Sequence, residues 1–317
     1  MSPGRILCVT SSLPRWAGDS STPFVLHLAQ DLQDLGWQVD VLAPHAEGAA
    51  RTETLGGVSV ERFRYLWPAR MQTVCYGGGA LANLRARPLD KLKVPALVAA
   101  EWAAVARRLS THRYDLLHSH WILPQGFVGM LARRSTRIPH VVTVHGGDIF
   151  ALRGKMLESL KRRVLRDADA VTVNSSHTEA AVREIAPQVG ILARIPMGVS
   201  VAPLDSRHAQ RVPEIRARHR RGRGPLVIFV GRLVDEKGPA DLLAALAQLS
   251  STLPDATALI VGDGPERAAL ARSLAVQARA HARENFSRAR SAGAMAELFL
   301  GLMYPRVPDE QLVKARP

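Results

Sequence analysis

The sequence predicts an α/β protein with a complete Rossmann-like N-terminal domain followed by an incomplete second Rossmann-like domain. Three observations lead to this prediction. Short β-rich runs alternate with longer helical runs, which is typical of parallel sheets built from β–α units. The alternation restarts after an arginine-rich segment at 204–224. It then stops after two units, whereas a doubly wound half is normally built around at least three parallel strands.

The first domain is predicted over residues 1–203, and the hydrophobic pattern gives its elements in order. Apolar or alternating runs bounded by turn residues predict strands at 5–11, 37–44, 58–66, 115–121, 140–146 and 170–175. Amphipathic runs predict helices at 24–36, at 96–110, from about 125, and near 155–166. Gly36 stands where a helix C-terminus favours glycine. The segment 75–95, with three consecutive glycines and two prolines, is predicted as a mobile loop.

The second domain is predicted from the same pattern on a smaller scale. Residues 204–224 are expected to be an arginine-rich linker, 225–275 a partial domain and 276–317 a group of C-terminal helices. Within the partial domain, strands are expected at 225–231 and 257–264 and helices at 239–250 and 265–274.

Composition limits the class of protein. With 317 residues and 47% hydrophobic side chains, the chain can bury two cores of ordinary size. No apolar run approaches the roughly 20 residues that cross a bilayer, and no secretory leader is evident at the start. Two cysteines give no disulfide framework. These features predict a cytoplasmic protein.

The net charge of +14 has several interpretations. The 36 arginines against 6 lysines indicate a compositional bias, and a basic surface can also bind nucleic acid or anionic lipid. The densest cluster, 211–224, holds six arginines and no aromatic side chain on which bases could stack. We therefore expect a solvated linker or a membrane-facing edge there, and no specific nucleic-acid partner.

The loop "GRLVDEKG" at 231–238 is the first candidate site. It follows a predicted strand and precedes a helix that opens with Pro239, so its position matches that of ligand loops in open α/β sheets. Arg232 can grip a phosphate with two donors and Lys237 adds a mobile charge, which favours a diphosphate ligand. The alternative is that both cations pair with Asp235 and Glu236 on the surface.

A similar turn, "GDGP", follows the next strand. Gly262 and Gly264 permit a tight turn and a close approach of backbone to a ligand, although a purely structural turn explains them equally well. The chain contains neither a G-x-G-x-x-G fingerprint nor a G-x-x-x-x-G-K-[ST] loop, so this turn alone does not indicate nucleotide binding.

Together these motifs carry a family resemblance. "VGRLVDEKG" and "LIVGDGPER" resemble the donor-binding domain of GT-B glycosyltransferases of family 4. In the first domain, "SSLPRWAGDSSTP", "DLLHSHWILPQG", "VVTVHGGDIF", "DADAVTVNSS" and "IPMGV" follow in that family's order. The resemblance covers roughly residues 5–274, and it implies a GT-B-like fold and transfer of a hexose from a nucleotide-sugar to a glycan or lipid-linked acceptor.

The resemblance also implies roles for individual residues. Arg232 and Lys237 would bind the donor diphosphate, so that no metal is required, and His145 would contact the transferred sugar as the catalytic-site histidine. The loops around donor and acceptor would contain Gly18, Asp19, Asp148, Gly231, Gly262 and Gly264. Most of the family retain anomeric configuration without a clear protein nucleophile. The resemblance implies a role in polysaccharide biosynthesis and no cofactor apart from the nucleotide-sugar co-substrate. The basic surface, in turn, predicts peripheral contact with an anionic membrane, where it would reach a lipid acceptor.

The chain departs from the family near "LARSLAVQARAH". The family has a later E-x7-E segment whose carboxylates hold the donor sugar and ribose. Here the glutamates after the turn are Glu266, Glu284, Glu297 and Glu310, and no two are eight positions apart. Met197 and Ser200 replace an asparagine and an aspartate common in the family. These departures favour an alternative hypothesis, an internally deleted, non-catalytic glycosyltransferase remnant that acts at most as a binding module.

Overall fold

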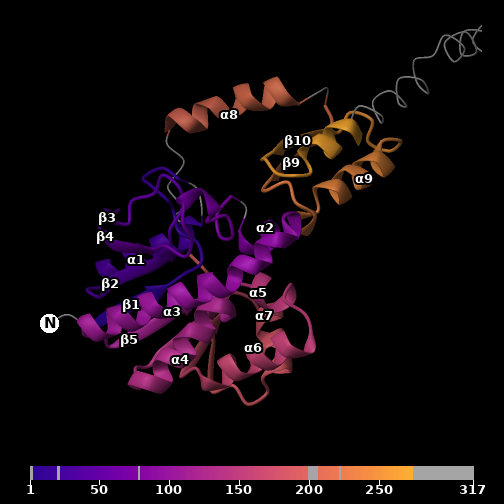
Figure 1. Cartoon of the computed structure of the whole chain (residues 1–317). Helices are drawn as coiled ribbons and strands as arrows, with labels where there is room; N and C mark the ends of the chain where they lie inside the picture. The colour runs from indigo at the N-terminus through magenta and orange to yellow at the C-terminus, as the bar shows by residue number, and fades with distance from the viewer. Residues whose placement is uncertain (1–2, 20–21, 78, 199–205, 221–222, 274–317) are drawn as a thin grey trace, which may run out of the picture. The chain divides into compact units, whose positions relative to one another are not determined.

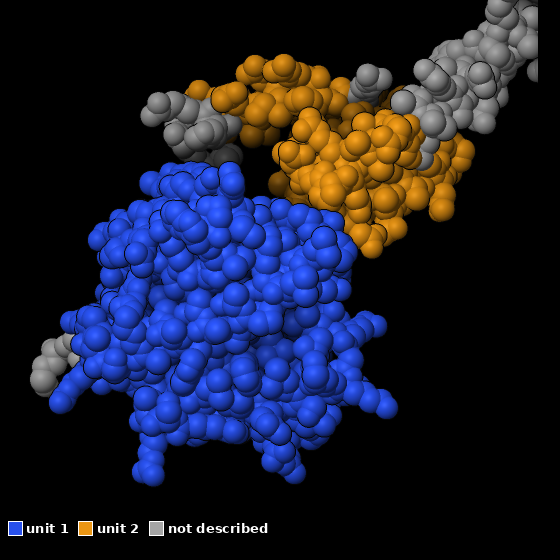
Figure 2. All heavy atoms as spheres, in the orientation of Figure 1, with its two compact units in different colours: residues 1–201 blue, residues 202–317 orange. Residues whose placement is uncertain are grey.

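The computed structural model describes residues 3–19, 22–77, 79–198, 206–220 and 223–273. The chain divides into two compact units, 1–201 and 202–317, which Figure 2 colours blue and orange. The predicted C-terminal helices at 276–317 lie outside the described residues. Within the described residues, no helix has both the length and the apolar composition needed to cross a membrane.

The first unit is built on one eight-stranded sheet (Figure 1). Its order is β3-β4-β2-β1-β5-β6-β7-β8, and every neighbouring pair is parallel except β3 with β4. The strands are β1 (Arg5–Val9), β2 (Gln38–Pro44), β3 (Thr52–Leu55), β4 (Val58–Phe63), β5 (Leu116–His120), β6 (His140–Val144), β7 (Ala170–Val173) and β8 (Ile191–Arg194). The strand order reverses between β1 and β5. In open α/β sheets ligands bind outside the carboxyl ends of the strands at such a switch point.

Helices cover both faces of this sheet, as a parallel sheet requires. They are α1 (Pro23–Asp34), α2 (Ala80–Ala86), α3 (Val94–Thr111), α4 (Phe127–Thr136), α5 (Gly147–Phe150), α6 (Lys155–Asp167) and α7 (Ser176–Ile185), with short turns η1 (Ala69–Met71), η2 (Pro88–Lys93) and η3 (Ile122–Gly126). Alternate residues of β1 enter different cores. Ile6 and Cys8 pack in the cluster that contains Leu26 of α1, whereas Leu7 packs in the cluster that contains Val105 of α3.

The predicted mobile loop at 75–95 is wrong in part, because it contains α2 and η2. Cys75 and Tyr76 before the glycines are buried. Asn83 of α2 donates hydrogen bonds from Nδ2 to the carbonyl oxygens of Val74 (2.9 Å) and Tyr76 (2.6 Å). These bonds anchor the helix to the preceding chain, a contact that the local sequence does not reveal. The strands β3 and β8 and the helix α7 were also not predicted.

The second unit contains α8 (Ser206–His219), β9 (Leu226–Val230), η4 (Asp235–Lys237), α9 (Pro239–Leu249) and β10 (Thr257–Val261). The helix α8 thus occupies much of the predicted linker. In the described part of this unit the sheet has two parallel strands, with Leu226 opposite Thr257 and Val230 opposite Val261. Its small core joins Leu233, Leu243 and Leu270.

Candidate functional site

The candidate site in the first unit lies where β1, β5 and β6 end. The segments that follow these strands, 10–19, 121–126 and 145–154, carry Gly18, Asp19, His145 and Asp148 of the predicted set. β1, β5 and β6 are neighbouring parallel strands, with β5 in the middle. Their carboxyl ends therefore lie at the same edge of the sheet, and the three segments leave the sheet there.

His145 follows β6 directly and is partly exposed. The chain then turns sharply at Gly146, whose φ of 92° lies in the left-handed region that favours glycine. The ring of His145 packs against both Phe24 (centroids 5.0 Å apart) and Trp121 (4.7 Å). Burial lowers the pKa of His145 to about 4, so at neutral pH the imidazole is uncharged.

Asp148 holds two loops together. Its Oδ2 accepts a hydrogen bond from the backbone N–H of Ile122 (2.8 Å), and its Oδ1 accepts one from the N–H of His145 (3.2 Å). The side chain is buried, and burial raises the pKa of Asp148 to about 6 against the opposing effect of these backbone donors. The structure therefore gives Asp148 a role in positioning the two loops; the expected contact with an acceptor stays a prediction.

The sequence did not predict three further residues of this site, at the end of β5 and directly after it: His118, His120 and Trp121. His120 Nδ1 lies 2.9 Å from His145 Nε2, and its ring centroid lies 4.4 Å from that of His118. His118 Nε2 in turn lies 2.7 Å from the hydroxyl of Thr143. The sequence signal was "HSH", because residues two apart on a strand share a face. Trp121 has a φ of 76°, a rare conformation for a bulky residue.

Gly18 and Asp19 lie in a closed turn after β1. The Asp19 carboxylate accepts hydrogen bonds from the backbone N–H of Arg15 (2.9 Å) and from its Nε (2.7 Å). Gly18 has a φ of 85°, and no atom lies within 4 Å of the position that a Cβ would take. The turn conformation therefore requires the glycine, and the aspartate stabilises the loop.

In the second unit, Arg232 and Lys237 are both exposed. In the part of the chain that the structure describes, neither forms an ion pair or a side-chain hydrogen bond with Asp235. Pairing with Glu236 stays an alternative prediction. The helix α9 begins just after them at Pro239, with Gly238 at φ 64° as its N-cap. The loop that carries both cations thus leads directly into a helix N-terminus, whose free N–H groups attract anions.

The glycines of the "GDGP" turn have a structural cause. The turn is joined to the "GRLVDEKG" loop by backbone hydrogen bonds from Gly231 N to Val261 O (3.0 Å) and from Leu233 N to Asp263 O (2.9 Å). A Cβ on Gly262 would lie 1.8 Å from the carbonyl oxygen of Gly231. Contact between the two loops therefore excludes a side chain there, and the loops form a single backbone unit around Arg232.

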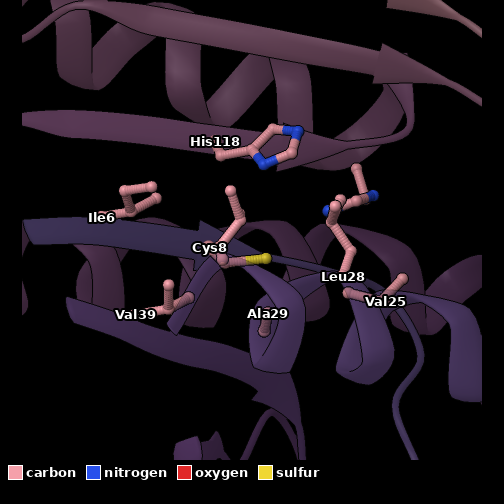
Figure 3. A pocket seen from close by; sticks show the side chains of 9 residues that line it. Ile6, Cys8, Val25, Leu28, Ala29, Val39 and His118 are labelled. Atoms are coloured by element: carbon pink, nitrogen blue, oxygen red, sulfur yellow. The ribbon is translucent and has the colours of Figure 1, made fainter. Parts of the chain in front are cut away.

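One group of side chains in the described residues could hold a metal ion. Ligand atoms of Cys8, His118 and His120 lie within 4.8 Å of one another. Cys8 and His118 are paired across β1 and β5, and Figure 3 shows both among the apolar side chains of Ile6, Val25 and Leu28. Burial raises the pKa of Cys8 to about 12, so the group is a neutral thiol, whereas a metal requires the thiolate. The expectation that the reaction needs no metal stays a prediction.

Two family models match the chain. One, described as "Glycosyl transferase 4-like domain", matches residues 21–198, and the other, "Glycosyl transferases group 1", matches residues 212–299.

Curated relatives agree with these matches. The chain is 32% identical over 163 residues to a GDP-mannose-dependent alpha-(1-6)-phosphatidylinositol monomannoside mannosyltransferase of Mycolicibacterium smegmatis, which covers 50% of this chain and 41% of that protein. It is 25% identical over 284 residues to the putative teichuronic acid biosynthesis glycosyltransferase TuaC of Bacillus subtilis, covering 84% and 67%. A 2-deoxystreptamine glucosyltransferase of Streptomyces kanamyceticus is matched over 45% of its length. The chain thus spans less than half of two of these three relatives.

Solved structures show the fold. A sucrose-phosphate synthase from Thermosynechococcus elongatus superposes with a TM-score of 0.60 at 23% identity, covering 86% of this chain and 67% of that one. Anabaena HepE in complex with UDP-glucose superposes with a TM-score of 0.56 at 20% identity, covering 89% and 67%. The chain has the GT-B fold and belongs to the 4-like glycosyltransferase family.

Proposed function

We propose that this protein transfers a hexose from a nucleotide-sugar to a glycan or lipid-linked acceptor, without a metal ion and with retention of anomeric configuration. The observation that carries the proposal is the pair of exposed cations, Arg232 and Lys237, in the loop that leads from β9 into α9. Phosphate oxygens are the ligands that such a loop binds best.

The proposed chemistry follows from these charges. In the reaction, the bond between the anomeric carbon and the diphosphate oxygen breaks, and a new bond forms to the acceptor hydroxyl oxygen. The hydroxyl proton passes to the departing diphosphate. Arg232 and Lys237 stabilise the negative charge that develops on this leaving group, as a metal ion does in other enzymes. His145 of the first unit contributes a contact to the transferred sugar.

Names of the relatives support the substrate class. One relative is a GDP-mannose-dependent mannosyltransferase acting on a phosphatidylinositol mannoside, another is assigned to teichuronic acid biosynthesis, and HepE is solved with UDP-glucose. We therefore place this chain in polysaccharide or glycolipid biosynthesis. The excess of basic residues supports the further proposal that the protein contacts an anionic membrane peripherally, where a lipid-linked acceptor is found.

The test is turnover by the purified full chain. UDP-glucose and GDP-mannose are supplied with a membrane fraction, with EDTA present and absent, and product is resolved by NMR at the anomeric proton. Transfer that EDTA leaves intact and that yields the α-anomer from an α-donor supports the proposal. Transfer that EDTA abolishes contradicts metal independence, and inversion contradicts retention.

A second candidate function is a non-catalytic binding module. One observation favours it: the E-x7-E pair that the family resemblance leads us to expect after the turn is missing from this sequence. This hypothesis predicts no turnover with any donor and no nucleoside diphosphate binding. Calorimetry with UDP and GDP separates the two candidates, because binding that is lost in the Arg232→Ala, Lys237→Ala double variant contradicts the remnant hypothesis. Arg272→Ala, an exposed arginine outside both loops, is the matched control.

A further inference from the structure

His120 and His145 share a hydrogen bond between their rings. His120 Nδ1 lies 2.9 Å from His145 Nε2, and the two rings are nearly parallel, with an interplanar angle of 17°. Both imidazoles are neutral, since burial lowers the pKa of His145 to about 4 and that of His120 well below its ordinary value. One of the two facing nitrogens is therefore protonated and donates the hydrogen bond, and the other accepts it with its lone pair.

The second nitrogen of His120 decides where that proton is. His120 Nε2 is buried and has no hydrogen-bond partner in the residues that the structure describes. If His145 were the donor, neutral His120 would carry its proton on Nε2, and this buried N–H would have no acceptor. If His120 Nδ1–H is the donor, Nε2 keeps only a lone pair. A buried N–H without an acceptor is the more costly of the two.

The surroundings of His120 agree with this assignment. The His120 ring lies near Cys8 and His118. One nitrogen or sulfur atom from each of the three side chains lies within 4.8 Å of the other two. Because burial keeps Cys8 protonated, its S–H is a weak donor close to the His120 ring, whereas a thiolate acceptor is absent. The rest of the surface beside these residues is apolar, and includes Ile6, Val25 and Leu28 (Figure 3).

We propose that His120 is a positioning residue that holds His145 as the Nδ1–H tautomer, so that His145 presents a hydrogen-bond donor to a hydroxyl group of the transferred sugar. The inference rests on the proposed function only for the identity of the ligand. His145 Nδ1 has no hydrogen-bond partner among the described residues, and the ring is partly exposed. A neutral N–H at this position donates a hydrogen bond to a hydroxyl oxygen, and it lacks the positive charge with which an imidazolium would favour an anionic sugar.

The first test needs no ligand. The full chain is labelled with ¹⁵N in its histidine rings, and two-bond ¹⁵N–¹H correlations are recorded at neutral pH. The expected spectrum shows His145 protonated at Nδ1 with a bare Nε2, and His120 protonated at Nδ1. A His145 protonated at Nε2 overturns the inference, whether or not the chain transfers a sugar.

Two variants then test positioning. In His120→Asn the amide nitrogen replaces Nδ1 as a donor, whereas His120→Phe keeps a ring and removes the donor. In His120→Phe we expect His145 to be no longer fixed in the Nδ1–H form. This variant should bind UDP-glucose or GDP-mannose about fivefold to tenfold more weakly, and should bind UDP and GDP as the wild type does. His120→Asn should restore both properties. His140→Asn is the matched control, because His140 is equally buried but bonds to Ser119 rather than to His145.

The outcomes separate the two proposals. Equal weakening of nucleotide and nucleotide-sugar binding in His120→Phe overturns the positioning role, as does a His145 tautomer that this variant leaves unchanged. A wild-type chain that binds neither nucleotide nor nucleotide-sugar contradicts the proposed function. In that case the wild-type tautomer and its response to the two His120 variants still decide whether His120 positions His145.

Discussion

A side chain on Gly264 would collide with Leu233: the Cβ would lie 2.3 Å from the Leu233 carbonyl oxygen. The same oxygen accepts a hydrogen bond from the N–H of Glu266 at 3.2 Å, so the backbone at Leu233 is held on both sides. The fit between these two loops places Arg232 in its observed backbone position. Stability of the second unit and affinity for a diphosphate are therefore expected to change together.

Gly264→Ala tests this coupling. Because the clashing atom belongs to the backbone, the loops must move apart, at a cost of roughly 1–3 kcal/mol in unfolding free energy of the second unit. Urea denaturation and UDP or GDP titration should show both losses. Gly190→Ala is the control, since no atom lies within 4 Å of its Cβ position. Full affinity in Gly264→Ala with reduced stability would argue against the coupling.

Arg232 is expected to contribute more than a positive charge. Arg232→Ala should weaken nucleoside diphosphate binding about tenfold to a hundredfold, the range of a hydrogen bond to a charged group. Arg232→Lys keeps the charge but not the paired donors, so it should recover only part of the loss. Calorimetry at two salt concentrations measures both variants. Full recovery in Arg232→Lys would show that the site needs only charge.

Glu101 should lower the free energy of unfolding of the first unit as the pH rises. This carboxyl is fully buried in α3, and burial raises its pKa to about 8; its Oε1 and the Oε1 of Gln125 both lack partners among the described residues. With the folded pKa above the unfolded one, the stabilisation is complete below about pH 4.5 and is lost as pH rises through 8.

Glu101→Gln removes this cost. A neutral amide can pair with Gln125 in both directions, and the variant should be more stable than the parent by on the order of 2–3 kcal/mol at pH 8 and by much less at pH 5. Chemical denaturation at both pH values measures the difference. An advantage that does not grow with pH would contradict the assignment.

The buried histidines should make the first unit labile to mild acid. Burial lowers the pKa of His118, His140 and His145 to about 4, below the value of 6.5 expected in the unfolded chain. Folded pKa values below the unfolded ones give stability that is present above pH 6.5 and lost as pH falls toward 4. Each histidine contributes a slope of up to about 1.4 kcal/mol per pH unit. The three histidines together lose more stability on acidification than Glu101 and Asp148 gain. The free energy of unfolding should therefore be lower at pH 5 than at pH 7.

The sequence predicted the elements whose structure depends on a local hydrophobic pattern and on turn residues. The strand, loop and helix around "GRLVDEKG" appear as predicted, including Pro239 in the first helical turn, and Gly36 has the left-handed φ of 92° expected after α1. The strand β3 escaped prediction because it is an edge strand of only four residues, two of which are exposed threonines. Its pairing with β4 is tertiary information.

The site was less predictable for the same reason. His145 was identified from the family resemblance, but its partner His120 lies 25 positions earlier, and only the parallel pairing of β5 with β6 brings the rings together. Gly262 and Gly264 were read as sites for ligand approach or as a turn. The structure adds a cause that no single motif contains, the carbonyl oxygens of Gly231 and Leu233.

Among the described residues, each buried apolar cluster draws its members from a single unit: three lie within residues 6–192 and the fourth within 229–270. Selection can therefore act on the two halves at different rates. An insertion or loss in the second half leaves the members of the three clusters of the first half unchanged, so the first half can keep its own core while the second half varies in length.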